Sequence, residues 1–244
     1  MARFGGRTIV TEEDTEPLQS IVNGDGTSTI AYLDRLRAAS TPFVSSIADQ
    51  INSDLGLVSE VNSKKAAAAL GKSLRPTTLS NYPWFQLSHL RDYLRFRTYL
   101  NTPDDFLSVM SRFELLQSQG AINLVKIDTA KLGRPGPFGW RMVATDFRIV
   151  ASGLIVEHYM TFTDMIRINE DWLHSVYEKW RGSSTAGLTI GQAAALDRDS
   201  RFSRKAYLAF LIDDILRSSP GVPALRAARR FNDDTVVNLL VSRI

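Results

Sequence analysis

The sequence has no cysteine and only three histidines among its 244 residues. Without cysteine there is no disulfide framework, no thiolate nucleophile and no cysteine-ligated zinc. The histidines are His89, His158 and His174. They are too dispersed for a helical pair of zinc ligands, and none is followed by aspartate, as a histidine–aspartate phosphohydrolase requires. A metal ion bound by this chain would therefore be held mostly by carboxylates.

Long hydrophobic runs are also missing. The longest ones, such as Gly153–Val156 and Ala206–Ile212, are much shorter than the roughly 20 residues that span a bilayer. The segment Met1–Asp25 carries acidic side chains where a signal peptide needs an apolar stretch. We therefore expect no membrane partner.

The composition that remains is typical of a folded protein. Hydrophobic residues make up 44% of the chain and charged residues 23%, so most of the chain can fold around a core. The length allows one large domain or two small ones. Lys and Arg outnumber Asp and Glu by 29 to 26, which gives a net charge of +3. This mild basic excess suits an anionic partner but does not require one.

Helices are expected toward both ends of the chain. Apolar residues at helical spacing predict two helices between residues 29 and 57, the second beginning at Thr41-Pro42. The alanine-rich stretch Ser63–Leu74 predicts a short basic helix. The segment Leu188–Ile244 predicts about three helices with a break at Ser218–Pro223.

The centre of the chain alternates strands and helices. The expected elements are a strand near Leu90–Thr98, a helix from Pro103 to Gly120, a strand at Ile122–Ile127, a hairpin of Trp140–Val150 and Leu154–Phe162, and a helix at Asp164–Arg181. This order predicts an α+β fold in which a mixed β-sheet of about four to five strands is flanked by helices.

Two carboxylates are the first candidates for chemistry. Asp92 lies at the start of a predicted strand that also carries Arg95 and Arg97, and such a group can bind a divalent cation and phosphate oxygens. These three residues fit a solvated edge strand equally well. Glu157 interrupts an apolar strand, so it either faces solvent or serves as a ligand or base.

Further candidates are aromatic and basic. Trp140 and Arg141 leave a loop rich in glycine and proline, where a tryptophan can stack on a nucleobase and an arginine can bind phosphate. The more common alternative is that Trp140 packs into the core. Lys64 and Lys72 on the basic helix can bind a polyphosphate, although such a cluster is more often a solvated face.

The order of these features resembles the synthetase domain of RelA/SpoT-type alarmone synthetases, which are nucleotide pyrophosphokinases, over about half of the chain. The segments that carry the resemblance are the helix with Lys64, Lys65 and Lys72, the Asp-x-x-x-x-Arg strand Asp92–Arg97, Gly139-Trp140-Arg141 for a Gly-Tyr-Arg loop exit, Glu157-His158-Tyr159 for Glu-x-Gln, and His174–Glu178 for a His-x-x-Tyr-Glu helix.

The resemblance implies a role for each matching residue. Asp92 and Glu157 would hold Mg²⁺ on a donor ATP, with Glu157 also the base and Arg97 a further catalytic residue. ATP would be bound by Lys64, Lys72 and Arg95, and the acceptor by Trp140, Arg141, Lys131, Arg134, His174 and Tyr177.

The implied activity is transfer of the β,γ-pyrophosphate of ATP to a ribose hydroxyl of a purine nucleotide. The sequence departs from the family pattern at Trp140, Tyr159 and Met142-Val143-Ala144, which leaves open whether the acceptor is a guanosine nucleotide, an adenosine nucleotide or the 3′ end of tRNA. A basic cluster at Arg226, Arg229 and Arg230 would favour RNA. A non-catalytic nucleotide- or RNA-binding module is the alternative from another class.

The resemblance also implies a biological setting. The protein would be a growth-inhibiting toxin or effector that acts in the cytoplasm, reaches a target cell by a route without a signal peptide if it is secreted, and is neutralised by an immunity or antitoxin protein. We expect a flexible tail at residues 1–28, the synthetase domain at 29–182 and a helical extension at 183–244 packed on the same domain.

Overall fold

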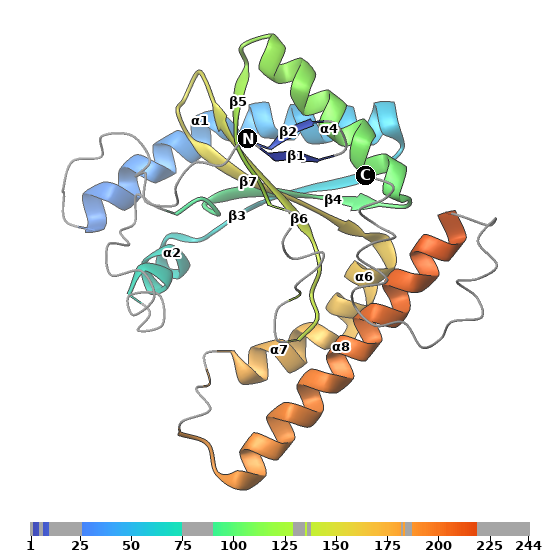
Figure 1. Ribbon diagram of the computed structural model, residues 1–244. Coiled ribbons are helices and arrows are strands. Elements are labelled where there is room, and N and C mark those ends of the chain that lie inside the picture. Colours follow the sequence, from blue (N-terminus) through green and yellow to red (C-terminus); the bar gives the residue numbers. More distant parts are fainter. Residues whose placement is uncertain are drawn as a thin grey trace. The chain divides into compact units, whose positions relative to one another are not determined.

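The computed structural model describes residues 2–4, 7–9, 26–74, 90–128, 135, 138–181, 183 and 187–218 (Figure 1). The described residues belong to two compact units. Unit 1 contains residues 2–4, 7–9, 26–74, 90–98, 108–127 and 144–159, and unit 2 contains 99–107, 128, 135, 138–143, 160–181, 183 and 187–218. The short strands β1 (Ala2–Phe4) and β2 (Arg7–Ile9) form an antiparallel pair. The domain boundaries expected from the sequence stay a prediction.

A five-stranded sheet organises unit 1. Its strands are β3 (Val58–Ser63), β4 (Leu94–Leu100), β5 (Ile122–Asp128), β6 (Val143–Ile149) and β7 (Ile155–Phe162), in the spatial order β3-β4-β7-β6-β5. Three helices accompany them: α1 (Gly26–Leu55), α2 (Ala66–Ser73) and α4 (Pro103–Ser118). The expected α+β fold with a mixed sheet is confirmed.

One face of the sheet packs against α4 and forms the core. Phe96 of β4 and His158 of β7 stack with ring centroids 4.0 Å apart, and both rings contact Phe113 of α4 at 6.1 and 5.0 Å. Because successive residues of a strand point to opposite faces, Arg95, Arg97 and Glu157 lie on the other face. We call this second face the polar face.

Helix α1 is continuous, although the sequence predicted a new helix at Thr41-Pro42. Pro42 lies inside the helix, and the Thr41 hydroxyl donates a hydrogen bond of 2.8 Å to the Arg37 carbonyl. A proline inside a helix costs stability because it removes one backbone hydrogen bond. The cost is offset by a single buried stripe that runs on both sides of the proline and includes Leu33, Val44, Ile47 and Ile51. The prediction of two helices is therefore wrong.

The edge strand β3 was not predicted. Its side chains alternate between exposed and half-buried, so it shows none of the apolar alternation that reveals a strand. Ser59 nevertheless holds it in place, because its hydroxyl bonds the Thr98 hydroxyl of β4 at 2.8 Å, and its amide donates to the Asn52 side chain of α1 at 2.6 Å.

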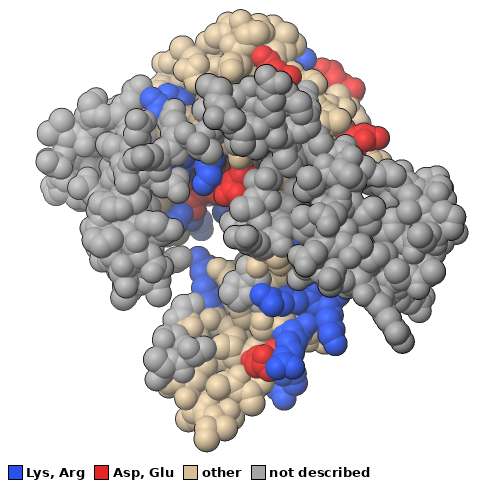
Figure 2. Space-filling view, viewed as in Figure 1, with Lys and Arg blue, Asp and Glu red and all other residues tan. Residues whose placement is uncertain are grey.

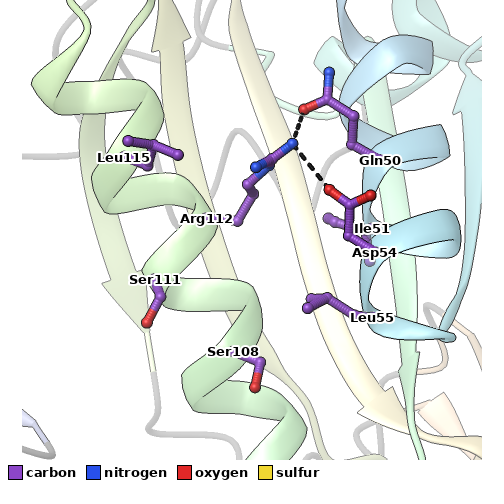
Figure 3. A pocket seen from close by; sticks show the side chains of 8 residues that line it. All are labelled: Gln50, Ile51, Asp54, Leu55, Ser108, Ser111, Arg112 and Leu115. Atoms are coloured by element: carbon purple, nitrogen blue, oxygen red, sulfur yellow. Dashed lines mark hydrogen bonds and ion pairs between the residues drawn. The ribbon is translucent and has the colours of Figure 1, made fainter.

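Helices α1 and α4 are joined at the surface by Arg112. Its guanidinium donates to the Gln50 side chain and forms an ion pair of 3.2 Å with Asp54, which is half exposed (Figure 3). Ile51 and Leu55 of α1 line the same shallow pocket. An exposed pair of this kind contributes at most about 1 kcal/mol to stability.

Unit 2 is mainly helical. It contains α6 (Thr163–Ile168), a single π-helical turn η2 (Asn169–Leu173), α7 (His174–Trp180) and α8 (Ile190–Ser218). The helix predicted from Asp164 to Arg181 is thus confirmed, with a π turn in its middle. The described part of the C-terminal segment is one helix, and the rest of that prediction lies outside the described residues. No helix in the described ranges is long and apolar enough to cross a bilayer.

His158 predicts a dependence of stability on pH. The residue is completely buried, and this burial lowers its pKa to about 3. The folded state keeps the imidazole neutral while the unfolded state binds a proton below its ordinary value of 6.5. Stability should therefore be complete above pH 6.5 and fall as the pH drops, by about 2 kcal/mol at pH 5. Denaturant unfolding at several pH values measures this slope.

The control for this prediction is His158→Gln. Glutamine can still bond the Thr98 hydroxyl, which lies 2.9 Å from the histidine Nε2, but it does not titrate. The variant should be less stable at neutral pH, because it loses the stacked ring, and the fall in stability between pH 7 and pH 5 that His158 causes should disappear. An equal slope in both proteins would show that His158 is not the titrating group.

Candidate functional site

Two lysines bind the carboxylate of Asp92. Lys64, just after β3, and Lys72, in the last turn of α2, place their Nζ atoms 2.8 and 3.1 Å from Asp92 Oδ2. Asp92 is 8% exposed. Although burial acts to raise the pKa of this carboxyl, the ammonium groups of Lys72 and Lys64 outweigh it and hold the pKa below its ordinary value. Asp92 is therefore a carboxylate at neutral pH.

Hydrogen bonds within this cluster and to residues of α1 hold its backbone in place. The Lys64 amide donates to the Tyr93 carbonyl at 2.9 Å, and Arg37 donates to the Lys64 carbonyl at 3.4 Å. The Tyr93 hydroxyl donates to Asp34 at 2.8 Å, and burial together with that carboxylate raises the pKa of Tyr93 to about 12. These contacts hold the chain on both sides of Asp92.

Glu157 lies on the neighbouring strand β7. Its backbone amide donates to the Arg91 carbonyl at 3.1 Å, which places Glu157 beside the start of β4. Burial raises the pKa of its carboxyl, and the negative charges of Asp92 and Asp146 raise it further, while Lys72 and Arg95 act in the opposite direction. A carboxylate with a raised pKa near cations is suited to accept a proton.

Asp146 of β6 is a site residue that the sequence interpretation missed. It is 7% exposed, and its Oδ2 lies 3.3 Å from Nη1 of Arg91. The signal was similar to the one used for Glu157, a carboxylate inside a largely buried strand, Val143–Ile149. The negative charges of both Asp92 and Asp146 therefore act on Glu157 in unit 1.

Arg97 connects the polar face to the edge strand. Its Nη2 lies 3.0 Å from Oε2 of Glu60 on β3. Tyr159, two residues after Glu157, has its pKa raised by burial, and the charges of Arg97 and Arg95 oppose this rise. Arg95 and Arg97 thus lie near Tyr159, and Arg95 is also close enough to Glu157 to affect its pKa.

Asp92 and Glu157 are the candidate ligands for a magnesium ion. Mg²⁺ is usually bound by one or two carboxylates together with substrate phosphates. Asp92 Oδ1 is buried and accepts no hydrogen bond from the residues that the structure describes, so one oxygen is available as a ligand. Among those residues no group of three or more His, Asp or Glu side chains has the geometry of a complete metal site. The phosphates of a bound nucleotide would have to complete it.

Unit 2 contains the candidates for acceptor binding. The Trp140 ring lies edge to face with Tyr207 of α8, with centroids 5.6 Å apart, and is half-buried. Arg141 is only 2% exposed, and its carbonyl accepts a hydrogen bond of 3.1 Å from Thr161. The Trp140 ring therefore contacts α8, and the backbone of Arg141 is bonded to β7.

The other acceptor candidates differ in accessibility. The side chain of His174 is 59% exposed and lies 3.8 Å from Glu178, one turn later on α7. Tyr177 is 40% exposed and packs edge to face on Phe138 at 6.0 Å. Lys131 and Arg134 lie outside the described residues.

Gly139 provides a prediction about the segment before Trp140. Its φ is +88°, and a Cβ atom built there would lie 2.7 Å from the Cα of Arg204. Gly139→Ala should therefore destabilise the protein by about 2–3 kcal/mol or displace α8, because both the backbone conformation and the space exclude a side chain. Thermal unfolding measures the loss.

Gly120→Ala is the matched control. Gly120 also has a positive φ, +70°, but no atom of the residues that the structure describes lies within 4 Å of the position of its Cβ. It should cost only about 1 kcal/mol, since the backbone strain is the sole penalty. Equal losses in the two variants would show that the contact with α8 is unimportant.

The fold of this chain is similar to that of several solved structures. Small alarmone synthetase 1 from Bacillus subtilis bound to its product pppGpp gives a TM-score of 0.50 at 14% identity, over 75% of this chain and 93% of that chain. A second crystal structure of the same protein gives 0.48, and a GTP pyrophosphokinase family protein from Streptococcus pneumoniae gives 0.46 at 11% identity, over 86% of this chain and 93% of that one.

The likeness to the first of these structures concerns the fold. The chain has a RelA/SpoT-type synthetase fold, as its sequence predicted. No protein-family model matches the chain, and no curated protein matches it.

Proposed function

We propose that this chain, which has the fold of a small alarmone synthetase, is an ATP- and Mg²⁺-dependent pyrophosphokinase that acts on a ribose hydroxyl of a purine nucleotide. The observation that carries the proposal is the cluster on the polar face: Asp92 bound by Lys64 and Lys72, with Glu157 close enough for these charges to affect its pKa. The similar structure that holds pppGpp as product supports a nucleotide substrate.

The proposed reaction transfers two phosphates in one step. The acceptor oxygen forms a bond to the β-phosphorus of ATP, the bond between that phosphorus and the oxygen bridging to the α-phosphate breaks, and AMP leaves. Glu157 takes the proton of the acceptor hydroxyl. Its raised pKa makes the carboxylate a better base than an exposed glutamate, which suits this role.

The cations of the polar face would bind the donor. Transfer of phosphoryl groups depends mainly on positioning and on neutralising charge, and Lys64, Lys72 and Arg95 supply positive charge where ATP would lie. Asp92 and Glu157 would hold the magnesium ion, which when bound neutralises the phosphate oxygens and polarises the reacting phosphorus. Arg97, whose guanidinium is paired with Glu60, would add a further positive charge beside the bound ATP.

Unit 2 would bind the acceptor. Trp140 offers a π-face to a purine base, and the exposed His174 and Tyr177 would contact the sugar and the phosphates. The acceptor role that the resemblance implies for the buried Arg141 requires its guanidinium to become accessible when the acceptor binds. Lys131 and Arg134 keep the acceptor roles that the resemblance implies. Trp140 has no hydroxyl where the family has tyrosine, so the chain is expected to select its base by stacking more than by hydrogen bonding.

The test is a transfer assay with a panel of acceptors. The protein is incubated with ATP labelled in the γ-phosphate and with GDP, GTP, ADP, AMP or tRNA. Label should appear on a purine nucleotide in the presence of Mg²⁺ and disappear with chelator. Transfer to none of the acceptors would contradict the proposal and favour a binding module without catalysis.

A basic surface on α8 is the reason to include tRNA among the acceptors. Exposed basic side chains gather over α8 (Figure 2), where Arg198, Arg201, Arg204 and Lys205 lie within two turns. If tRNA is the acceptor, its affinity should fall steeply with salt because several phosphates are contacted, whereas the affinity for a mononucleotide should fall little.

We further propose that the activity inhibits growth. A pyrophosphokinase that consumes ATP and purine nucleotides without control would deplete both. Expression in a bacterial host should arrest growth, and Glu157→Gln should relieve the arrest. An arrest that persists with the variant would show that inhibition does not come from pyrophosphate transfer. Co-expression of an immunity or antitoxin protein should restore growth in cells that carry the active enzyme, and should have no effect in cells that carry the Glu157→Gln variant.

A further inference from the structure

The ion pair of Arg91 and Asp146 has no part in the mechanism above. Arg91 directly precedes Asp92, and its guanidinium reaches Asp146 on β6 at 3.3 Å. Both side chains are almost buried, at 13% and 10% exposed. The pair therefore joins the start of β4 to β6 next to the carboxylate that is bound by two lysines.

The strand register places Asp146 beside Glu157. In the hairpin of β6 and β7, the Ile149 amide donates to the Leu154 carbonyl at 3.0 Å. Three positions further along each strand, Asp146 lies opposite Glu157 on the same face. Like charges directly opposite each other in a sheet are destabilising, so Arg91 offsets a repulsion that the strand pairing creates.

The offset of this repulsion does not by itself explain why an ion pair lies at this place. Buried ion pairs contribute little net stability, and an apolar pair would serve the fold as well. Guanidinium groups, however, bind phosphate oxygens in a fixed geometry, and a carboxylate that holds the guanidinium lowers the entropy lost on binding. The neighbouring cations Lys64 and Lys72 already point to this part of the polar face as the place for a polyphosphate.

We propose that Asp146 is a positioning residue, and that it holds the Arg91 guanidinium at the polar face to bind a phosphate of the ATP donor. The inference rests on the proposed function and adds a donor contact to it. Asp146 acts through Arg91 and touches no substrate itself. Its effect on ATP should therefore vanish when Arg91 is absent.

A double-mutant cycle tests this dependence. Binding of a non-hydrolysable ATP analogue with Mg²⁺ is measured by calorimetry, and the KM for ATP in the transfer assay is measured alongside. Arg91→Ala should weaken ATP binding about 30-fold and Asp146→Asn about 10-fold, with a smaller effect on kcat. In the Arg91→Ala background, Asp146→Asn should change binding by less than about 2-fold.

Two further variants separate positioning from folding. Asp146→Glu keeps the charge but displaces it by one methylene, so it should weaken ATP binding about 3-fold, and only when Arg91 is present. Asp54→Asn removes the partner of Arg112 on the outer helices and should leave ATP binding unchanged. All variants are compared at a temperature at which thermal unfolding shows each to be folded.

The outcomes are distinct. If Asp146→Asn lowers the melting temperature but not the affinity for the ATP analogue, the pair is only structural and the inference is wrong. If the two substitutions multiply in effect, Asp146 acts on something other than Arg91 and the inference is also wrong. Absence of transfer by the wild type would contradict the proposed function, while the binding cycle would still decide the role of Asp146.

Discussion

Glu157→Gln is expected to reduce the rate of pyrophosphate transfer by about 10³-fold, since it removes both the proposed base and one magnesium ligand. The amide has nearly the same shape as the carboxylate, so the β7 strand and its pairing should be kept. The rate of AMP formation from ATP at saturating acceptor measures the effect.

The same substitution should not harm folding. Burial and the negative charges of Asp92 and Asp146 disfavour the ionised form of Glu157, so its pKa is raised in the folded state. Between its ordinary value of 4.5 and the raised folded value, the folded state binds more protons, and stability falls as the pH rises through this range. At neutral pH, Glu157→Gln should therefore melt at the same temperature as the wild type or higher.

The control for Glu157→Gln is Glu114→Gln. Glu114 lies exposed on α4, which covers the opposite face of the sheet, and its loss should leave transfer unchanged. A Glu157→Gln protein that is folded and transfers at the wild-type rate would remove Glu157 from the mechanism.

Asp92→Asn is expected to affect both activity and stability. The substitution leaves the ammonium groups of Lys64 and Lys72, which are 15% and 32% exposed, without their common partner. Removing one partner from a largely buried pair costs about 2–3 kcal/mol after allowance for the partial exposure of Lys72. Transfer should fall by about 10²-fold or more, because a metal ligand is lost as well. Denaturant unfolding and the transfer rate measure the two effects.

The dependence on pH provides an independent check on Asp92. Its pKa is lowered in the folded state, so the stability it contributes is complete above its ordinary value of 3.8 and is lost as the pH falls through the lower folded value. Asp92→Asn should flatten this acid-side loss. Asp54→Asn, at an exposed pair, should cost less than about 1 kcal/mol. An equally small cost for Asp92→Asn would show that the lysines do not depend on it.

Much of the fold follows from local patterns in the sequence. The alternation of Arg95 and Arg97 with Phe96 and Thr98 predicted both the strand and its two faces, and Thr102-Pro103 with Gly120 predicted the limits of α4 within two residues. Such signals depend only on neighbours in the chain. The edge strand β3 and the continuity of α1 across Pro42 depend on packing between distant segments, and for that reason the sequence interpretation missed them.

In the site, too, some residues follow from local patterns and others depend on contacts between distant segments. Asp92, Glu157, Lys64 and Lys72 were selected one by one, from their types and order, and unit 1 brings them together. Asp146 was missed because its importance comes from the strand register, which sets it opposite Glu157, and a register is a property of two strands. The contact of Gly139 with α8 could not be predicted either, since it joins segments more than sixty residues apart.

The most direct test of the proposed function is to identify the products formed from ATP. With the preferred purine nucleotide and Mg²⁺, we expect one AMP for each acceptor molecule that gains two phosphates, and about 10³-fold slower formation of both products by the Glu157→Gln variant. Formation of ADP or inorganic phosphate without AMP would show a different bond to be broken, and would contradict a pyrophosphokinase.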